Sequence, residues 1–78
     1  MVRENGIVKY KRGRKRGSGR TYIIRYIVGV KQKEIRLYEA IDTDASFHSG
    51  DRISVDITDD SISVYNNELN IGVKGKKV

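Results

Sequence analysis

The sequence contains no cysteine and no proline, and it has no long apolar run. Without cysteine, neither a disulfide framework nor a thiolate zinc site can form. Without proline, no strand is interrupted by a residue that lacks a backbone donor. No segment approaches the roughly 18 apolar residues of a membrane span, and the charged N-terminal residues do not resemble a signal peptide. We therefore expect a soluble cytoplasmic protein with no membrane partner.

The length of 78 residues predicts a single small domain at residues 1–78. The core of a domain of this size usually provides about 3–5 kcal/mol of net stability. Because no disulfide can add to that stability, formation of a homodimer would be a reasonable way to bury more apolar surface.

Charge is strongly segregated along the chain, whose formal net charge is +6. Residues 1–38 carry a balance of +10, residues 39–70 a balance of −7, and residues 71–78 a balance of +3. Like charges that are packed together repel one another. Because solubility does not require such segregation, the basic half indicates an anionic partner.

Apolar and polar residues alternate through most of the chain after residue 20, as they do in half-buried strands. The segments with this period are "EIRLYEAID" (34–42), "RISVDITD" (52–59), "SISVYN" (61–66) and "ELNIGVK" (68–74). In the first of them, Ile41 is expected on the same side as Ile35 and Leu37. With no sustained helical period, the sequence predicts an all-β fold, a small five- or six-stranded antiparallel barrel that is OB-like or SH3-like.

The segment "TYIIRYIVGV" (21–30) is rich in β-branched and aromatic residues and carries apolar groups on both faces. It predicts a long strand that bends to serve two sheets, with Gly29 at the bend. Whether Tyr22 and Tyr26 are core or surface residues remains open. A shorter strand is predicted at "GIVKY" (6–10), and connections are predicted at "VKQKE" (30–34), "TDDS" (58–61) and "YNNE" (65–68).

The segment "KYKRGRKRGSGRTY" (9–22) contains seven Lys or Arg residues and no carboxylate. Its glycines, Gly13, Gly17 and Gly19, favour a mobile hairpin loop, which we place at residues 11–20. Lys and Arg side chains neutralise phosphates and release condensed counterions. The loop therefore predicts nucleic-acid binding without a base code.

Aromatic side chains of the basic half could add base stacking, which is worth about 1–3 kcal/mol per base. Tyr38 alternates with Ile35 and Leu37 and should be exposed. The predicted nucleic-acid-binding residues are Lys9, Lys11, Arg12, Arg14, Lys15, Arg16, Arg20, Tyr22, Arg25, Arg36 and Tyr38. We expect single-stranded DNA or RNA as the partner. A double-stranded-DNA-binding transcriptional regulator, or a protein-interaction or inhibitor module that docks the loop on an acidic partner, remains an alternative.

No residue pattern indicates catalysis. His48 is the only histidine, and Ser46 and Ser49 beside it seldom reach the geometry of a catalytic triad from one loop. The aspartate pairs at 42 and 44 and at 59 and 60 fall where turns are expected, and turn geometry explains them without a cation. We therefore predict a protein that is not an enzyme and that has no cofactor and no metal.

Two family resemblances concern the layout of the segments. The order "GSGRTYIIRYIVGVKQKEIRLYEAI", "FHSGDRISVDI" and "SISVYNNELNIGV" resembles the filamentous-phage gene V-type single-stranded-DNA-binding proteins over residues 17–73. That resemblance implies an OB-like barrel, a dimer that coats single strands, and Arg20, Tyr22, Arg25 and Arg36 near the nucleic acid. The segment "FHSGDRISVDITDDSISV" is similar to the strand-turn-strand part of AbrB-type swapped-hairpin DNA-binding proteins, which implies a DNA-binding role.

Overall fold

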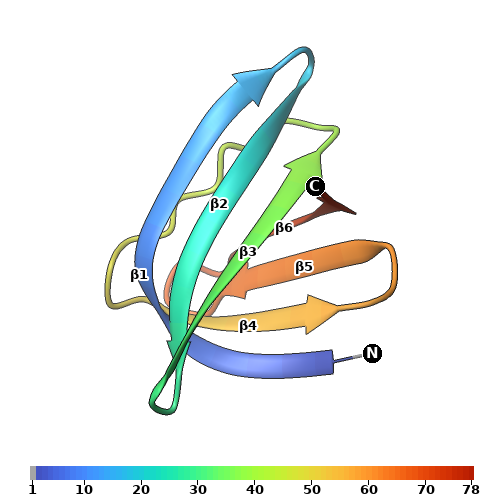
Figure 1. The fold of residues 1–78 in the computed structure, drawn as a ribbon. Coiled ribbons are helices and arrows are strands. Elements are labelled where there is room, and N and C mark those ends of the chain that lie inside the picture. Colours follow the sequence, from blue (N-terminus) through green and yellow to red (C-terminus); the bar gives the residue numbers. More distant parts are fainter. Residues whose placement is uncertain (1) are drawn as a thin grey trace.

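The computed structural model describes residues 2–78, and in that range it contains six antiparallel strands and no helix (Figure 1). The strands are β1 (Val2–Arg16), β2 (Gly19–Val28), β3 (Lys31–Glu39), β4 (Arg52–Ile57), β5 (Ser61–Asn66) and β6 (Ile71–Lys77). The predicted all-β antiparallel fold is confirmed. A search of the described residues finds no helix that is long and apolar enough to span a membrane.

The strands form one sheet that closes on itself in the order β1-β2-β3-β6-β5-β4. β1 makes this closure possible because its first part, Val2–Ile7, pairs with β4 and its remainder pairs with β2. The long strand that serves two parts of the barrel is therefore β1, and not residues 21–30 as predicted. Gly29 lies in the β2–β3 turn with a φ of 62° rather than at a bend within a strand.

Several predicted strand boundaries are wrong. The turn between β2 and β3 is so short that Val28 pairs directly with Lys31, so most of the predicted connection 30–34 belongs to β3. At the end of β3, Ile41 lies outside the strand and is 80% exposed. Leu69 likewise precedes β6 and is exposed.

The inward side chains of all six strands fill the barrel. The buried apolar residues are Val8, Tyr22, Ile24, Tyr26, Ile35, Leu37, Ala45, Phe47, Ile53, Val55, Ile62, Val64 and Val73. Tyr22 and Tyr26 are at most 1% exposed, so both are core residues. Burial raises the pKa of Tyr22 to about 12, because the phenolate would lose its hydration.

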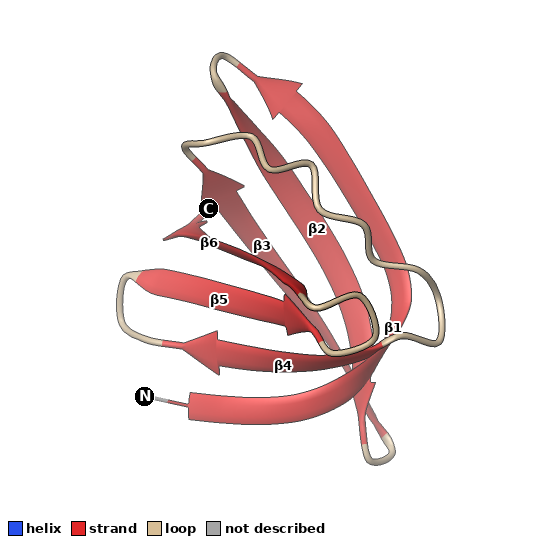
Figure 2. Cartoon of the chain, turned by 180° about the vertical axis from the view of Figure 1, so that it is seen from behind, coloured by secondary structure: helices blue, strands red, loops and turns tan. Residues whose placement is uncertain are grey.

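Residues 40–51, which we call the strap, connect β3 to β4 and are held down along their length. Figure 2 shows the strap running from the end of β3 across β2 towards β4. The buried carboxylate of Glu39 accepts hydrogen bonds of 2.8 Å from the backbone N–H and from the hydroxyl of Thr43. The buried amide of Asn66 donates to the carbonyl of Ser46 (3.0 Å) and to the carboxylate of Asp51 (2.9 Å). The strap is therefore a fixed part of the barrel.

Candidate nucleic-acid interface

The basic segment 11–20, predicted as a mobile loop, is almost entirely strand in the structure. β1 continues to Arg16 and β2 begins at Gly19, so only Gly17 and Ser18 form the turn. Gly17 has a φ of 60°, which suits the first central position of a type II′ hairpin turn. The prediction was wrong because pairing with the strongly β-forming β2 satisfies the backbone of the basic strand. Alternation also sends the side chains of successive cations to opposite faces.

A β-bulge at Lys9 decides which face the arginines occupy. Val8 points into the core opposite Tyr26, but the register shifts before Tyr10 pairs with Arg25. Without that extra residue, strict alternation from Val8 would turn the side chains at 10, 12, 14 and 16 inward. With it, they point outward, and Lys9 is exposed at the bulge itself.

The outward side chains of four neighbouring strands form one surface, which we call the outer basic face. It consists of Tyr10, Arg12, Arg14 and Arg16 on β1, Thr21, Ile23 and Arg25 on β2, Glu34, Arg36 and Tyr38 on β3, and Lys76 on β6. Six of these side chains are cationic and one is a carboxylate, so the face carries a charge of +5.

The cations of this face differ in their partners. Arg25 and Arg36 share the carboxylate of Glu34, at 2.9 and 3.2 Å, and these two guanidinium groups lower the pKa of Glu34. Among residues 2–78, by contrast, no carboxylate lies within 4.0 Å of the cationic atoms of Arg12, Arg14 or Arg16. The three arginines along β1 are therefore available to an external anion.

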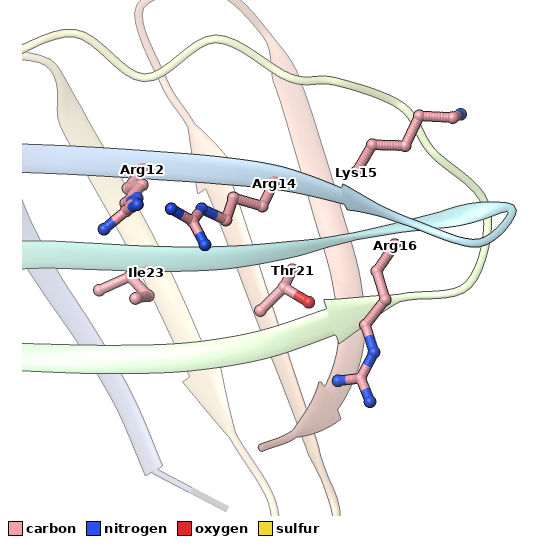
Figure 3. Close-up of a pocket in the computed structure, with 6 residues that line it drawn as sticks. All are labelled: Arg12, Arg14, Lys15, Arg16, Thr21 and Ile23. Atoms are coloured by element: carbon pink, nitrogen blue, oxygen red, sulfur yellow. The ribbon is translucent and has the colours of Figure 1, made fainter.

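A shallow hollow of about 270 Å³ lies beside these arginines. Figure 3 shows Arg12 and Arg14 on β1 beside Ile23 and Thr21 on β2, whereas Lys15 points away from them. An apolar strip flanked by guanidinium groups can accept the flat part of a ligand while the cations hold its charged part.

Lys11, Lys15 and Arg20 were predicted in the interface but lie on the inner face of the β1–β2 hairpin. Arg20 contacts Asp42 at 2.8 Å and Asp44 at 3.4 Å, and Lys15 contacts Asp42 at 3.3 Å. The hydrogen bond from the guanidinium of Arg20 lowers the pKa of Asp42, and the hydrogen bond from the ammonium of Lys15 lowers it further by a smaller amount. Lys15 and Arg20 are therefore ion-paired with aspartates of the strap. The ammonium of Lys11 lies over the ring of buried Tyr22, 5.5 Å from its centroid.

The aromatic side chains are also redistributed. Tyr22 cannot stack on a base because it is buried, so its predicted role is wrong. Tyr38 lies on the outer face as predicted, but it is half-buried, since its ring covers Gly19 and its hydroxyl donates to the carbonyl of Arg16 (3.3 Å). Tyr10, omitted from the prediction, is 44% exposed, and the guanidinium of Arg25 lies 5.3 Å from its ring centroid. Its alternation with Arg12 was the sequence signal that could have identified it.

Comparisons of the chain with protein-family models, with curated proteins and with solved structures find no match. The gene V-type and AbrB-type resemblances therefore stay predictions.

Proposed function

We propose that this chain is a non-catalytic protein that binds single-stranded DNA or RNA across the outer basic face. The observation that carries the proposal is the row of three unpaired arginines, Arg12, Arg14 and Arg16, on one side of β1. Alternate residues of a strand lie about 6.5–7 Å apart. That interval is comparable with the distance between consecutive phosphates in an extended nucleic-acid strand, so each guanidinium can meet one phosphate.

The neighbouring strands supply surfaces for the bases. With the phosphates along β1, the bases would extend over β2, where Ile23 and Thr21 line the hollow. Tyr10 lies at one end of this surface and Tyr38 towards the other. Stacking on aromatic and apolar groups is tolerant of sequence, which fits a site built from Ile23 and two tyrosine rings beside the arginines.

The surroundings of the hairpin favour a single strand over a duplex. The major groove of B-DNA admits an isolated two-stranded ribbon. Here β3 pairs with β2 up to the Arg20–Glu39 pair, close to the turn of the β1–β2 hairpin. Little more than that turn is therefore free of a third strand, and the hairpin is not an isolated ribbon. A face this broad suits a flexible strand lying across it.

A titration tests the proposal. A labelled single-stranded oligonucleotide of about 16 nucleotides should bind with a logarithmic salt slope of about −2 or steeper, as expected for three or more phosphate contacts. The duplex of the same length should bind more weakly when anisotropy is measured under the same conditions. Equal affinity for the single strand, the duplex and heparin would overturn the proposal, because it would leave only unspecific attraction between charges.

Replacing Tyr10 with alanine should weaken single-strand binding by about 1–3 kcal/mol, whereas Tyr10→Phe should change it little, because a ring suffices for stacking. Tyr65→Ala is the matched control, since Tyr65 is similarly exposed, at 43%, but lies on β5. The affinities are compared by the same anisotropy titration. A loss for Tyr65→Ala as large as for Tyr10→Ala would show that the outer basic face is not where bases bind.

A further inference from the structure

The second half of β1 has a neighbouring strand on one side only. β4 pairs with β1 no further than Ile7, and the strap continues the contact for one residue, through Val8 N–H to Asp51 (2.9 Å) and Gly50 N–H to Val8 (2.8 Å). Within residues 2–78, no backbone hydrogen bond reaches residues 9–16 from that side. Figures 1 and 2 both show this part of β1 at the margin of the sheet. It is therefore an open strand edge.

Hairpin geometry identifies the backbone groups that face outward at this edge. In a two-residue hairpin the pair that flanks the turn, here Arg16 and Gly19, is hydrogen-bonded, and hydrogen-bonded and non-hydrogen-bonded pairs alternate from there. The N–H and C=O groups of Lys11, Gly13 and Lys15 then point away from β2. The outward bonds of Val8 agree with this pattern once the bulge at Lys9 is counted.

We infer that this edge accepts an extended, acidic segment of a partner protein as an additional β-strand. In such strand addition, main-chain hydrogen bonds hold the peptide and side chains select it. Every residue from Lys9 to Arg16 except Tyr10 and Gly13 is Lys or Arg. Acidic side chains on the outer side of the added strand would lie beside Arg12, Arg14 and Arg16, and such opposite-charge cross-strand pairs are favourable.

The same charges argue against a second copy of this chain as the occupant. Two β1 edges placed side by side would bring Lys and Arg rows together, and like charges on adjacent strands are destabilising. Cations on an edge are a common means of preventing self-association. The edge thus repels a second copy of the chain and attracts a partner strand that carries carboxylates.

The inference does not depend on nucleic-acid binding, because the edge acts through backbone groups and the outer basic face through side chains.

Gly13 offers a matched pair of variants for the test. Its N–H points to the free edge, so Gly13→Pro removes an edge donor and leaves the β1–β2 hydrogen bonds in place. The atoms nearest to an added Cβ belong to the flexible side chains of Arg20 and Lys11, at 3.2 and 3.4 Å. Gly13→Ala has the same Cβ and keeps the donor.

The probe is a peptide of alternating glutamate and threonine, as long as the edge. Bound to the unmodified chain, it should slow the hydrogen exchange of the Lys11, Gly13 and Lys15 amides, measured by NMR. Gly13→Pro should weaken its binding by about tenfold relative to Gly13→Ala, because one hydrogen bond is lost. The same peptide with N-methyl groups on alternate amides should bind the unmodified chain about as weakly as the unmethylated peptide binds Gly13→Pro. This measurement tests the inference even if the proline variant does not fold.

Three results would overturn the inference. Equal peptide affinity for Gly13→Pro and Gly13→Ala would show that only side-chain charge attracts the peptide. If the edge amides exchange slowly without peptide, and more slowly at higher protein concentration, the edge would be assigned to a second copy. Equal slowing by a single-stranded oligonucleotide would assign it to nucleic acid.

Discussion

Replacing Arg12, Arg14 and Arg16 together with alanine is expected to weaken single-strand binding by roughly 10²–10³-fold at low salt. Each charge-assisted contact contributes on the order of tenfold, and three contacts are removed. The logarithmic salt slope should become shallower by about 2, because about 0.7 of a counterion is released per phosphate contact on a single strand. The fold should persist, since the three side chains are exposed and have no ion-pair partner among the described residues.

The control variant removes the same charge from other faces. Arg3 and Arg52 lie on β1 and β4 outside the outer basic face, and they pair with Asp56 and Glu68. Lys31, opposite Val28 at the start of β3, has the parity of the inward Ile35 and Leu37 and so also lies outside that face. Replacing Arg3, Arg52 and Lys31 with alanine should change affinity much less than the arginine variant does. If both triple variants lose affinity equally, net charge alone governs binding and the arginine row has no special role.

Replacing Gly75 with alanine is expected to lower the free energy of unfolding by about 3 kcal/mol, near the upper end of the usual cost of overpacking. A Cβ at this position would lie 2.0 Å from the carbonyl oxygen of Tyr38 and 2.6 Å from its carbon. Both contacts are to backbone, so the strands themselves would have to separate. They would do so where the barrel closes, because β3 and β6 are joined by only two register pairs, Leu37–Lys77 and Tyr38–Lys76.

For a domain of this size, such a loss corresponds to a fall in the melting temperature of about 12–24 °C. Gly72→Ala on the same strand is the matched control, since a Cβ there would lie 3.0 Å from the exposed side chain of Tyr65, which can move, and 3.2 Å from the carbonyl oxygen of Val64, a far milder backbone contact than that at Gly75. Circular dichroism melts of the two variants make the comparison. Similar melting temperatures would contradict the close approach of β3 and β6.

Local pattern was sufficient for much of the fold. The alternation in 52–59 and 61–66 correctly predicted β4 and β5, and that in 34–42 predicted the inward Ile35 and Leu37 of β3. The same alternation placed Arg36 on the outside. These predictions succeed because the period of two in a strand is a property of neighbouring residues.

Only part of the predicted set of cations lies on one face. Contacts between residues distant in sequence divide the cations into a group that pairs with the strap and a group on the outer basic face. Asp42 binds Arg20 and Lys15, which precede it by 22 and 27 residues, and so removes them from the ligand-binding surface. Tyr22 could not be assigned to core or surface from its neighbours, because both faces of its strand carry apolar groups. Only the position of the strap and of β3 showed that its ring lies inside.

By itself, the sequence determined the all-β class, the segregation of charge and the inward and outward sides of most strands, because composition and period are carried by residues close together in the chain. Tertiary structure alone decided which face the arginines occupy. The bulge at Lys9 reverses the alternation between Val8 and Tyr10, and it becomes apparent only when β1 is paired with β2. One inserted residue in a strand register thus sets whether Arg12, Arg14 and Arg16 face the strap's aspartates or the solvent.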